Sequence, residues 1–115
     1  MTKKEKAALV LERKILNAIE AGEFTPDYGY LNNLLVGNGS RAGFLGPCGC
    51  ALAAAASVNG FESITAGPIE LRQYLKTVEM SEEDSIALED GYEDNFESST
   101  NPYFRVGQRL RRFHP

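Results

Sequence analysis

The chain has 115 residues, of which 43% are hydrophobic, and this length and composition predict one compact domain, residues 1–115. The formal net charge of -4 hides a segregated pattern, with basic residues near both ends and nine acidic but no basic residues within 79–97. No stretch approaches the roughly 20 apolar residues that span a bilayer, and no apolar run with a cleavage site marks a signal peptide. We therefore expect neither a membrane protein nor a secreted one.

The N-terminal segment carries the signals of a helix. Thr2-Lys3-Lys4-Glu5 has the sequence of a capping box, in which the Thr and Glu side chains accept hydrogen bonds from backbone N–H groups at a helix start. Apolar residues recur at helical spacing up to Gly22, which suits the position after the last turn, so a helix is predicted over about residues 3–21. Thr25-Pro26-Asp27 repeats the start signal and predicts a short second helix over residues 25–36.

The remaining segments complete a helical pattern. Five glycines within residues 37–49 predict a loop. The alanine-rich segment Cys48–Val58 follows, and its small side chains predict a buried central helix that its neighbours approach closely. Further helices are predicted to start at Pro68, at Ser81 and at Pro102, the second of them ending at Gly91. The sequence therefore predicts an all-α fold, a compact bundle of five to six short helices.

Cys48 and Cys50 lie at the predicted start of the alanine-rich helix. A helix N-terminus lowers the pKa of a thiol, because its dipole and free N–H groups favour the thiolate. One hypothesis is therefore a thiol-dependent enzyme centred on Cys48 and assisted by Cys50. Such enzymes need a histidine base, and the only histidine is His114, one residue from the end. The alternative is two small buried residues, kept reduced in the cytoplasm, where we expect the protein.

No pattern in the sequence predicts a cofactor. Residues 37–42 match the spacing of a dinucleotide-binding fingerprint, but neither a preceding strand nor a surrounding βαβ unit is predicted. Two thiols with one terminal histidine make a poor zinc site, and the acidic segment lacks the ligand spacing of a calcium loop. We therefore expect no metal and no other cofactor.

The acidic segment, residues 79–97, is the candidate binding region. One interpretation is a solvated helix face followed by a polar loop. The other is a negative surface that docks onto a basic partner, with aromatic residues among the acids as interface anchors. On this second interpretation, the residues predicted to contact a protein partner are Glu82, Glu83, Asp84, Glu89, Asp90, Tyr92 and Phe96.

The last predicted helix carries four arginines near aromatic residues: Arg105, Arg109, Arg111 and Arg112. Arginines beside aromatic rings can bind phosphates, but a sequence pI near 5.0 argues against a nucleic-acid binder. We expect these arginines to complement the negative end of their own helix and to pair with the acidic segment. An exposed cluster of three aromatic residues on this segment would suit a homodimer: Tyr103, Phe104 and Phe113.

At Cys48–Ala56, a cysteine opens a small-residue helix downstream of a helix and a glycine-bearing loop. This pattern, over residues 15–60, resembles small uncharacterised proteins of phages and bacterial mobile elements. The chain departs from that family after the next helix, where it has Leu88-Glu89-Asp90-Gly91-Tyr92 in place of a Trp-Asn-Asp-like turn. The resemblance implies a phage-type accessory role. The leading hypothesis is a non-enzymatic protein that acts on a host component by binding a protein partner.

Overall fold

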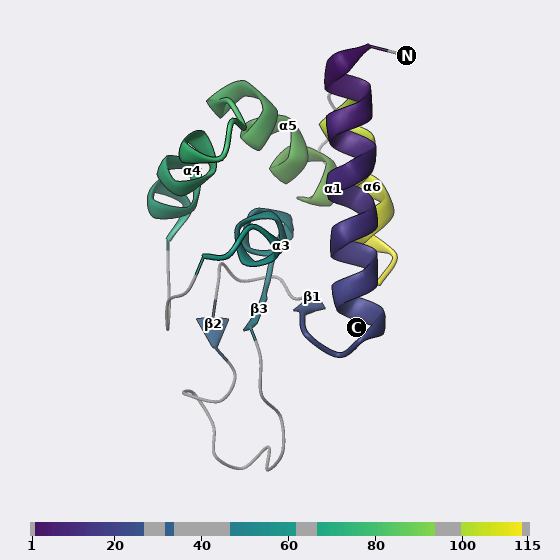
Figure 1. Ribbon diagram of the computed structural model, residues 1–115, viewed down its shortest axis with the longest axis vertical. Coiled ribbons are helices and arrows are strands. Elements are labelled where there is room, and N and C mark those ends of the chain that lie inside the picture. The colour runs from purple at the N-terminus through teal and green to yellow at the C-terminus, as the bar shows by residue number, and fades with distance from the viewer. Residues whose placement is uncertain (1, 27–31, 34–46, 62–66, 94–99, 114–115) are drawn as a thin grey trace.

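The computed structural model describes residues 2–26, 32–33, 47–61, 67–93 and 100–113 (Figure 1). Within these ranges the chain forms helices and three very short strands: α1 (Lys3–Glu20), β1 (Thr25–Pro26), β2 (Asn32–Asn33), β3 (Pro47–Gly49), α3 (Ala51–Val58), α4 (Pro68–Thr77), α5 (Glu82–Glu93) and α6 (Pro102–Arg111). The fold is an all-α bundle, as the sequence predicts. Its radius of gyration, 13.3 Å, is close to the roughly 13 Å expected of a compact chain of this length.

The capping box at the start of α1 is confirmed. The backbone N–H of Glu5 donates to Thr2 Oγ1 at 3.1 Å, and the backbone N–H of Thr2 donates to Glu5 Oε1 at 3.0 Å. After the helix ends, Gly22 takes a φ of 77°, which glycine adopts without strain. The apolar side of α1 packs into the core through Ala8, Leu11, Ile15 and Ala18.

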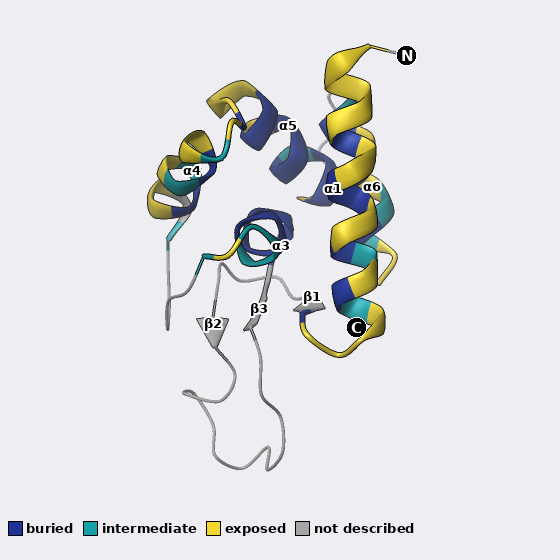
Figure 2. Cartoon of the chain, in the orientation of Figure 1, coloured by how far each residue is buried: buried dark blue, intermediate teal, exposed yellow. Residues whose placement is uncertain are grey.

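Helix α3 lies at the centre of the bundle (Figure 1), and all residues from Ala51 to Ala56 are buried (Figure 2). It contacts α1, α4 and α5. Alanine suits this place because one methyl group leaves room for helices to approach from several sides. The predicted buried central helix is confirmed, but it begins at Ala51 rather than at Cys48.

A small sheet with the strand order β1-β3-β2 connects to the start of α3 (Figure 1). β1 pairs with β3 in parallel, and β2 pairs with it antiparallel, so that Thr25 and Asn32 both lie opposite Cys48. The helix predicted over residues 25–36 is therefore wrong at the described positions, which are extended. The predicted glycine-rich loop, residues 37–49, becomes strand at 47–49, and its other residues lie outside the described ones.

The predicted starts of the last three helices are confirmed. α4 begins with Pro68. Ser81 precedes α5, and its Oγ accepts a hydrogen bond from the backbone N–H of Asp84 at 3.2 Å. Asn101 caps α6, because its Oδ1 accepts from the backbone N–H of Tyr103 at 2.9 Å. Helix α5 continues past its predicted end, because Gly91 lies inside the helix rather than after it.

Two glycines bring the backbones of α5 and α6 into contact. A Cβ atom at Gly91 of α5 would overlap the carbonyl oxygen of Phe104, and one at Gly107 of α6 would overlap the carbonyl oxygen of Leu88. The contact between these two helices is also the most extensive in the described part of the fold. Glycine is therefore required at both positions for the observed helix separation.

We predict that Gly107→Ala destabilises the protein by about 2 kcal/mol or more, since the added methyl group forces the two backbones apart and outweighs the better helix propensity of alanine. Chemical denaturation would measure the free energy of unfolding. Gly67→Ala is the control for a methyl group that meets nothing within 4 Å; because Gly67 is the N-cap of α4 and alanine is a poorer cap, a loss of at most about 1 kcal/mol is expected there. Equal stability of the two variants would contradict the proposed backbone contact.

Candidate functional site

Helical spacing gathers four acidic residues of α5 around one exposed isoleucine. Ile86 is 41% exposed. Glu82 and Glu83 stand four and three residues before it, and Asp90 and Glu93 stand four and seven residues after it. This spacing places all four acids on the same side of the helix as Ile86. Glu82, Glu83 and Glu93 are exposed, and Asp90 is half-buried. These five residues are called the acidic face of α5 below. The face contains no basic residue.

The other predicted contact residues do not join this face. Asp84, Glu89 and Tyr92 are buried on the inner side of α5, so the folded chain does not offer them to a partner (Figure 2 shows the buried side of the helix). Phe96 lies outside the described residues. Three of the predicted contact residues therefore face the core, whereas Ile86, which the sequence interpretation did not name as a contact residue, is an exposed apolar side chain of α5.

The two buried acids hold the helices together. Asp84 accepts a hydrogen bond from Asn101 Nδ2 at 2.9 Å and lies 3.1 Å from Lys4 Nζ, which ties the start of α5 to the start of α1. Glu89 Oε2 accepts a hydrogen bond from Arg72 Nη2 at 2.8 Å, which ties α5 to α4. Buried carboxylates need such partners, because desolvation of an unpaired charge is costly.

Negative charge crowds together at the C-terminal end of the acidic face. Burial raises the pKa of Glu93, and the carboxylates of Glu89 and Asp90 raise it further, while Arg72 and Arg111 act in the opposite direction. No basic residue stands in the last turn of α5 to complement the negative end of the helix. Deprotonated Glu93 is therefore in an unfavourable electrostatic environment.

Two of the four predicted arginines, Arg109 and Arg111, bond within the described chain, and only Arg111 does so with the acidic segment. Arg109 Nε donates to Glu12 Oε2 at 2.6 Å, and this hydrogen bond raises the pKa of Arg109. Glu12 is buried on α1, so the pair joins the two ends of the described chain. Arg111 does reach the acidic segment, where its Nη1 donates to the carbonyl oxygen of Tyr92 at 2.6 Å.

The predicted exposed aromatic cluster on α6 is not formed. Tyr103 and Phe104 are buried in the core, and only Phe113 is exposed. Burial also raises the pKa of Tyr103, with a further contribution from the nearby carboxylate of Asp84. The exposed cluster on which the expectation of a homodimer depended is therefore reduced to Phe113, and the homodimer stays a prediction.

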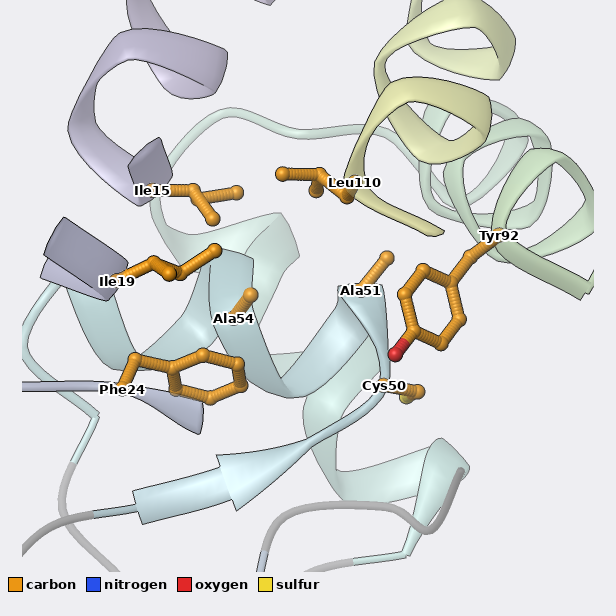
Figure 3. A pocket seen from close by; sticks show the side chains of 8 residues that line it. All are labelled: Ile15, Ile19, Phe24, Cys50, Ala51, Ala54, Tyr92 and Leu110. Carbon is orange, nitrogen blue, oxygen red and sulfur yellow. The ribbon is translucent and has the colours of Figure 1, made fainter. Parts of the chain in front are cut away.

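Cys50 is buried in the core. Its residue is 3% exposed, and it lines a small apolar space, too narrow for a water molecule, with Phe24 and with Tyr92, which reaches toward it from α5 (Figure 3). Burial raises the pKa of the Cys50 thiol to about 11 and outweighs the lowering effect of the nearby backbone N–H groups of Ala53 and Leu52. The structure thus contradicts a thiolate role for Cys50 and supports the alternative of a small core residue.

The rest of the thiol hypothesis stays a prediction. Cys48 contributes its backbone to β3, but its side chain and the whole of His114 lie outside the described residues. Within the described ranges, no group of three or more His, Cys, Asp or Glu residues could hold a metal ion. Among the described helices, none combines the length and the apolar character that a membrane crossing requires.

No family model, curated protein or solved structure matches this chain. The resemblance to phage and mobile-element proteins therefore stays a prediction. The support for a function comes from the described side chains, above all from the acidic face of α5.

We predict that Cys50 resists alkylation in the folded protein. Cys48→Ser removes the other thiol, and at about pH 8 only about one Cys50 in a thousand would be a thiolate, in addition to being enclosed. Mass spectrometry after treatment with iodoacetamide should find no label on the native variant and one label on the unfolded variant. Fast labelling of the native variant would show that the site around Cys50 is open.

We also predict that Glu93→Gln raises the melting temperature slightly at neutral pH. A carboxyl group whose pKa is raised in the folded state favours folding when protonated, and it loses that contribution as the pH rises through the raised pKa. The gain over wild type should therefore vanish below about pH 4, where Glu93 is protonated in both states. Thermal unfolding at both pH values, with the exposed Glu20→Gln as control, tests this; a lower melting temperature of Glu93→Gln at neutral pH would contradict it.

Proposed function

We propose that this protein is a small, non-enzymatic binding protein that recognises a basic surface on a protein partner through the acidic face of α5. The observation that carries the proposal is the arrangement of Glu82, Glu83, Asp90 and Glu93 around the exposed Ile86. The phage-type accessory role and a cytoplasmic location belong to the same proposal.

The chemistry of the face suits a protein partner. Charges at the rim of an interface steer association and select partners of opposite sign, while an apolar residue at the centre gains free energy from losing contact with water. Lys76 of α4 lies 3.8 Å from Glu82, but both side chains are well exposed, and such a pair contributes little. A basic partner can therefore displace it at small cost.

The position of the carboxylates also supports binding rather than stability. Glu93 stands where neighbouring carboxylates raise its pKa and where the end of its own helix is negative. Its charge opposes folding, so the folded chain gains nothing from a glutamate at this position. A bound cation would offset the repulsion among these groups.

The thiol-dependent alternative loses the assisting group that it required. Cys50 is enclosed, and its raised pKa keeps it as a thiol. An enzyme centred on Cys48 would have to act without it. The acidic face of α5, by contrast, is built from side chains whose exposure the structure describes.

The test is an affinity capture from bacterial lysate with the wild-type protein and two of its variants. The wild type is compared with E82Q/E83Q/E93Q, which removes three charges from the acidic face and leaves the buried Asp84 and Glu89 intact. The control is E20Q/E23Q/E70Q, which removes three exposed charges elsewhere. We expect a basic protein that is retained by the wild type and the control, lost with the face variant, and released by salt.

Two results would contradict the proposal. If the face variant and the control retain the same proteins, the acidic face does not select the partner. If the wild type retains no basic protein at low salt, the acidic face does not recognise one in the lysate. Circular dichroism of the three proteins checks that a lost partner does not reflect lost folding.

A further inference from the structure

A second charged face of opposite sign lies on the outer side of α1. Val10 is 56% exposed there. Lys3 and Lys6 stand seven and four residues before it, and Arg13 and Lys14 stand three and four residues after it. All are exposed, and none of them has an ion-pair partner among the described residues. These residues are called the basic face of α1: Lys3, Lys6, Val10, Arg13 and Lys14.

No acid interrupts the basic face. Glu12 points into the core, where it pairs with Arg109. Glu5 is held at the helix start by its hydrogen bond with the backbone N–H of Thr2. The outer side of α1 therefore presents positive charge around one aliphatic side chain, just as the outer side of α5 presents negative charge around Ile86.

The two faces mirror one another in spacing. When α1 and α5 are laid antiparallel with Val10 against Ile86, every cation of the basic face stands opposite a carboxylate of the acidic face. A parallel arrangement would instead place Glu83 and Glu93 opposite the uncharged Ala7 and Asn17. The antiparallel pairs are Lys3 with Glu93, Lys6 with Asp90, Arg13 with Glu83, and Lys14 with Glu82.

We propose that the basic face of α1 docks antiparallel onto the acidic face of α5 of a second copy of this chain. The inference rests on the proposed function and names a partner for the same face. No ion pair joins the two faces within the described part of one molecule. A second copy can bring them together.

A hollow beside Val10 gives the contact a place for an aliphatic side chain. It has a volume of about 260 Å³, and Ala7, Val10 and Lys14 of α1 form one wall. Val78 and Met80, from the connection between α4 and α5, contribute apolar surface to the opposite wall. In the antiparallel arrangement Ile86 of the second copy lies against Val10, at the edge of this hollow, where its side chain can be covered.

The contact should be weak and salt-dependent. One helix face against another buries less surface than a stable interface requires, and exposed ion pairs contribute little each. Screening by salt acts on all four pairs together. We therefore expect association at high protein concentration and low ionic strength, weakened about tenfold or more when the salt rises from about 20 mM to about 500 mM.

Sedimentation equilibrium with charge-reversal variants tests the proposal. The basic-face variant is K3E/R13E/K14E, and the acidic-face variant is E82K/E83K/E93K, so that three matched pairs are reversed and the pair of Lys6 with Asp90 is left unchanged. Wild type should associate at low salt, and each variant alone should be monomeric, because like charges then oppose one another. An equimolar mixture of the two variants should associate again, because both kinds of contact regain opposite charges.

A third variant separates docking from the effect of net charge. E20K/E23K/E70K has the same net charge as the acidic-face variant, but its changes lie outside both faces. By itself it should associate as the wild type does, because both faces are intact. If it is monomeric like the acidic-face variant, net charge alone explains the loss of association and the proposal is overturned. A monomeric wild type at low salt overturns it as well.

The variants also separate this inference from the proposed function. The basic-face variant keeps the acidic face, so it should lose self-association and still capture a foreign basic protein from lysate. If the wild type does not self-associate but still captures a basic protein, only the pairing between copies is refuted. If the wild type self-associates but captures no basic protein from the lysate, only the proposal of a foreign partner is refuted.

Discussion

Gly91 and Gly107 let the backbones of α5 and α6 touch, and the places of the other helices follow from that contact. With α6 held against α5, Arg109 reaches Glu12 and fixes α1. The inner side of α5 carries a second ion pair to α4, and α3 fills the centre with alanines. A steric constraint at two residues thereby determines which side of α5 faces solvent, and with it the existence of an acidic face.

Helix α5 divides its acids between two tasks, and the cost of burying charge explains the division. Asp84 and Glu89 are buried, and each has a basic group within ion-pair distance, at 3.1 Å and 2.8 Å. The exposed acids Glu82 and Glu83 keep most of their contact with water, so their charges cost less than the buried ones. A helix of this composition can therefore serve the core and the surface at once, provided that the inward acids find their cations.

Much of the fold could be predicted from local sequence signals. The errors arise where contacts between residues far apart in the sequence determine the structure. The caps at Thr2 and Asn101 depend on neighbouring residues, so the helix starts could be predicted. Residues 25–26 and 32–33 are extended because they pair with β3, which lies later in the chain and which no local signal reveals. The burial of Tyr92 was predictable from helical spacing after Leu88, whereas the pairing of Arg109 with a residue 97 positions away was not.

The ion pair between Glu12 and Arg109 has a consequence for how the chain folds during synthesis. α1 leaves the ribosome before α6, which packs against its apolar side. At roughly 5–20 residues per second, several seconds pass between the synthesis of Glu12 and that of Arg109, its partner. During that time Leu11 and Ile15 of α1 lack their contact with α6, and the charges of Lys3, Lys4 and Lys6 favour the solubility of the helix.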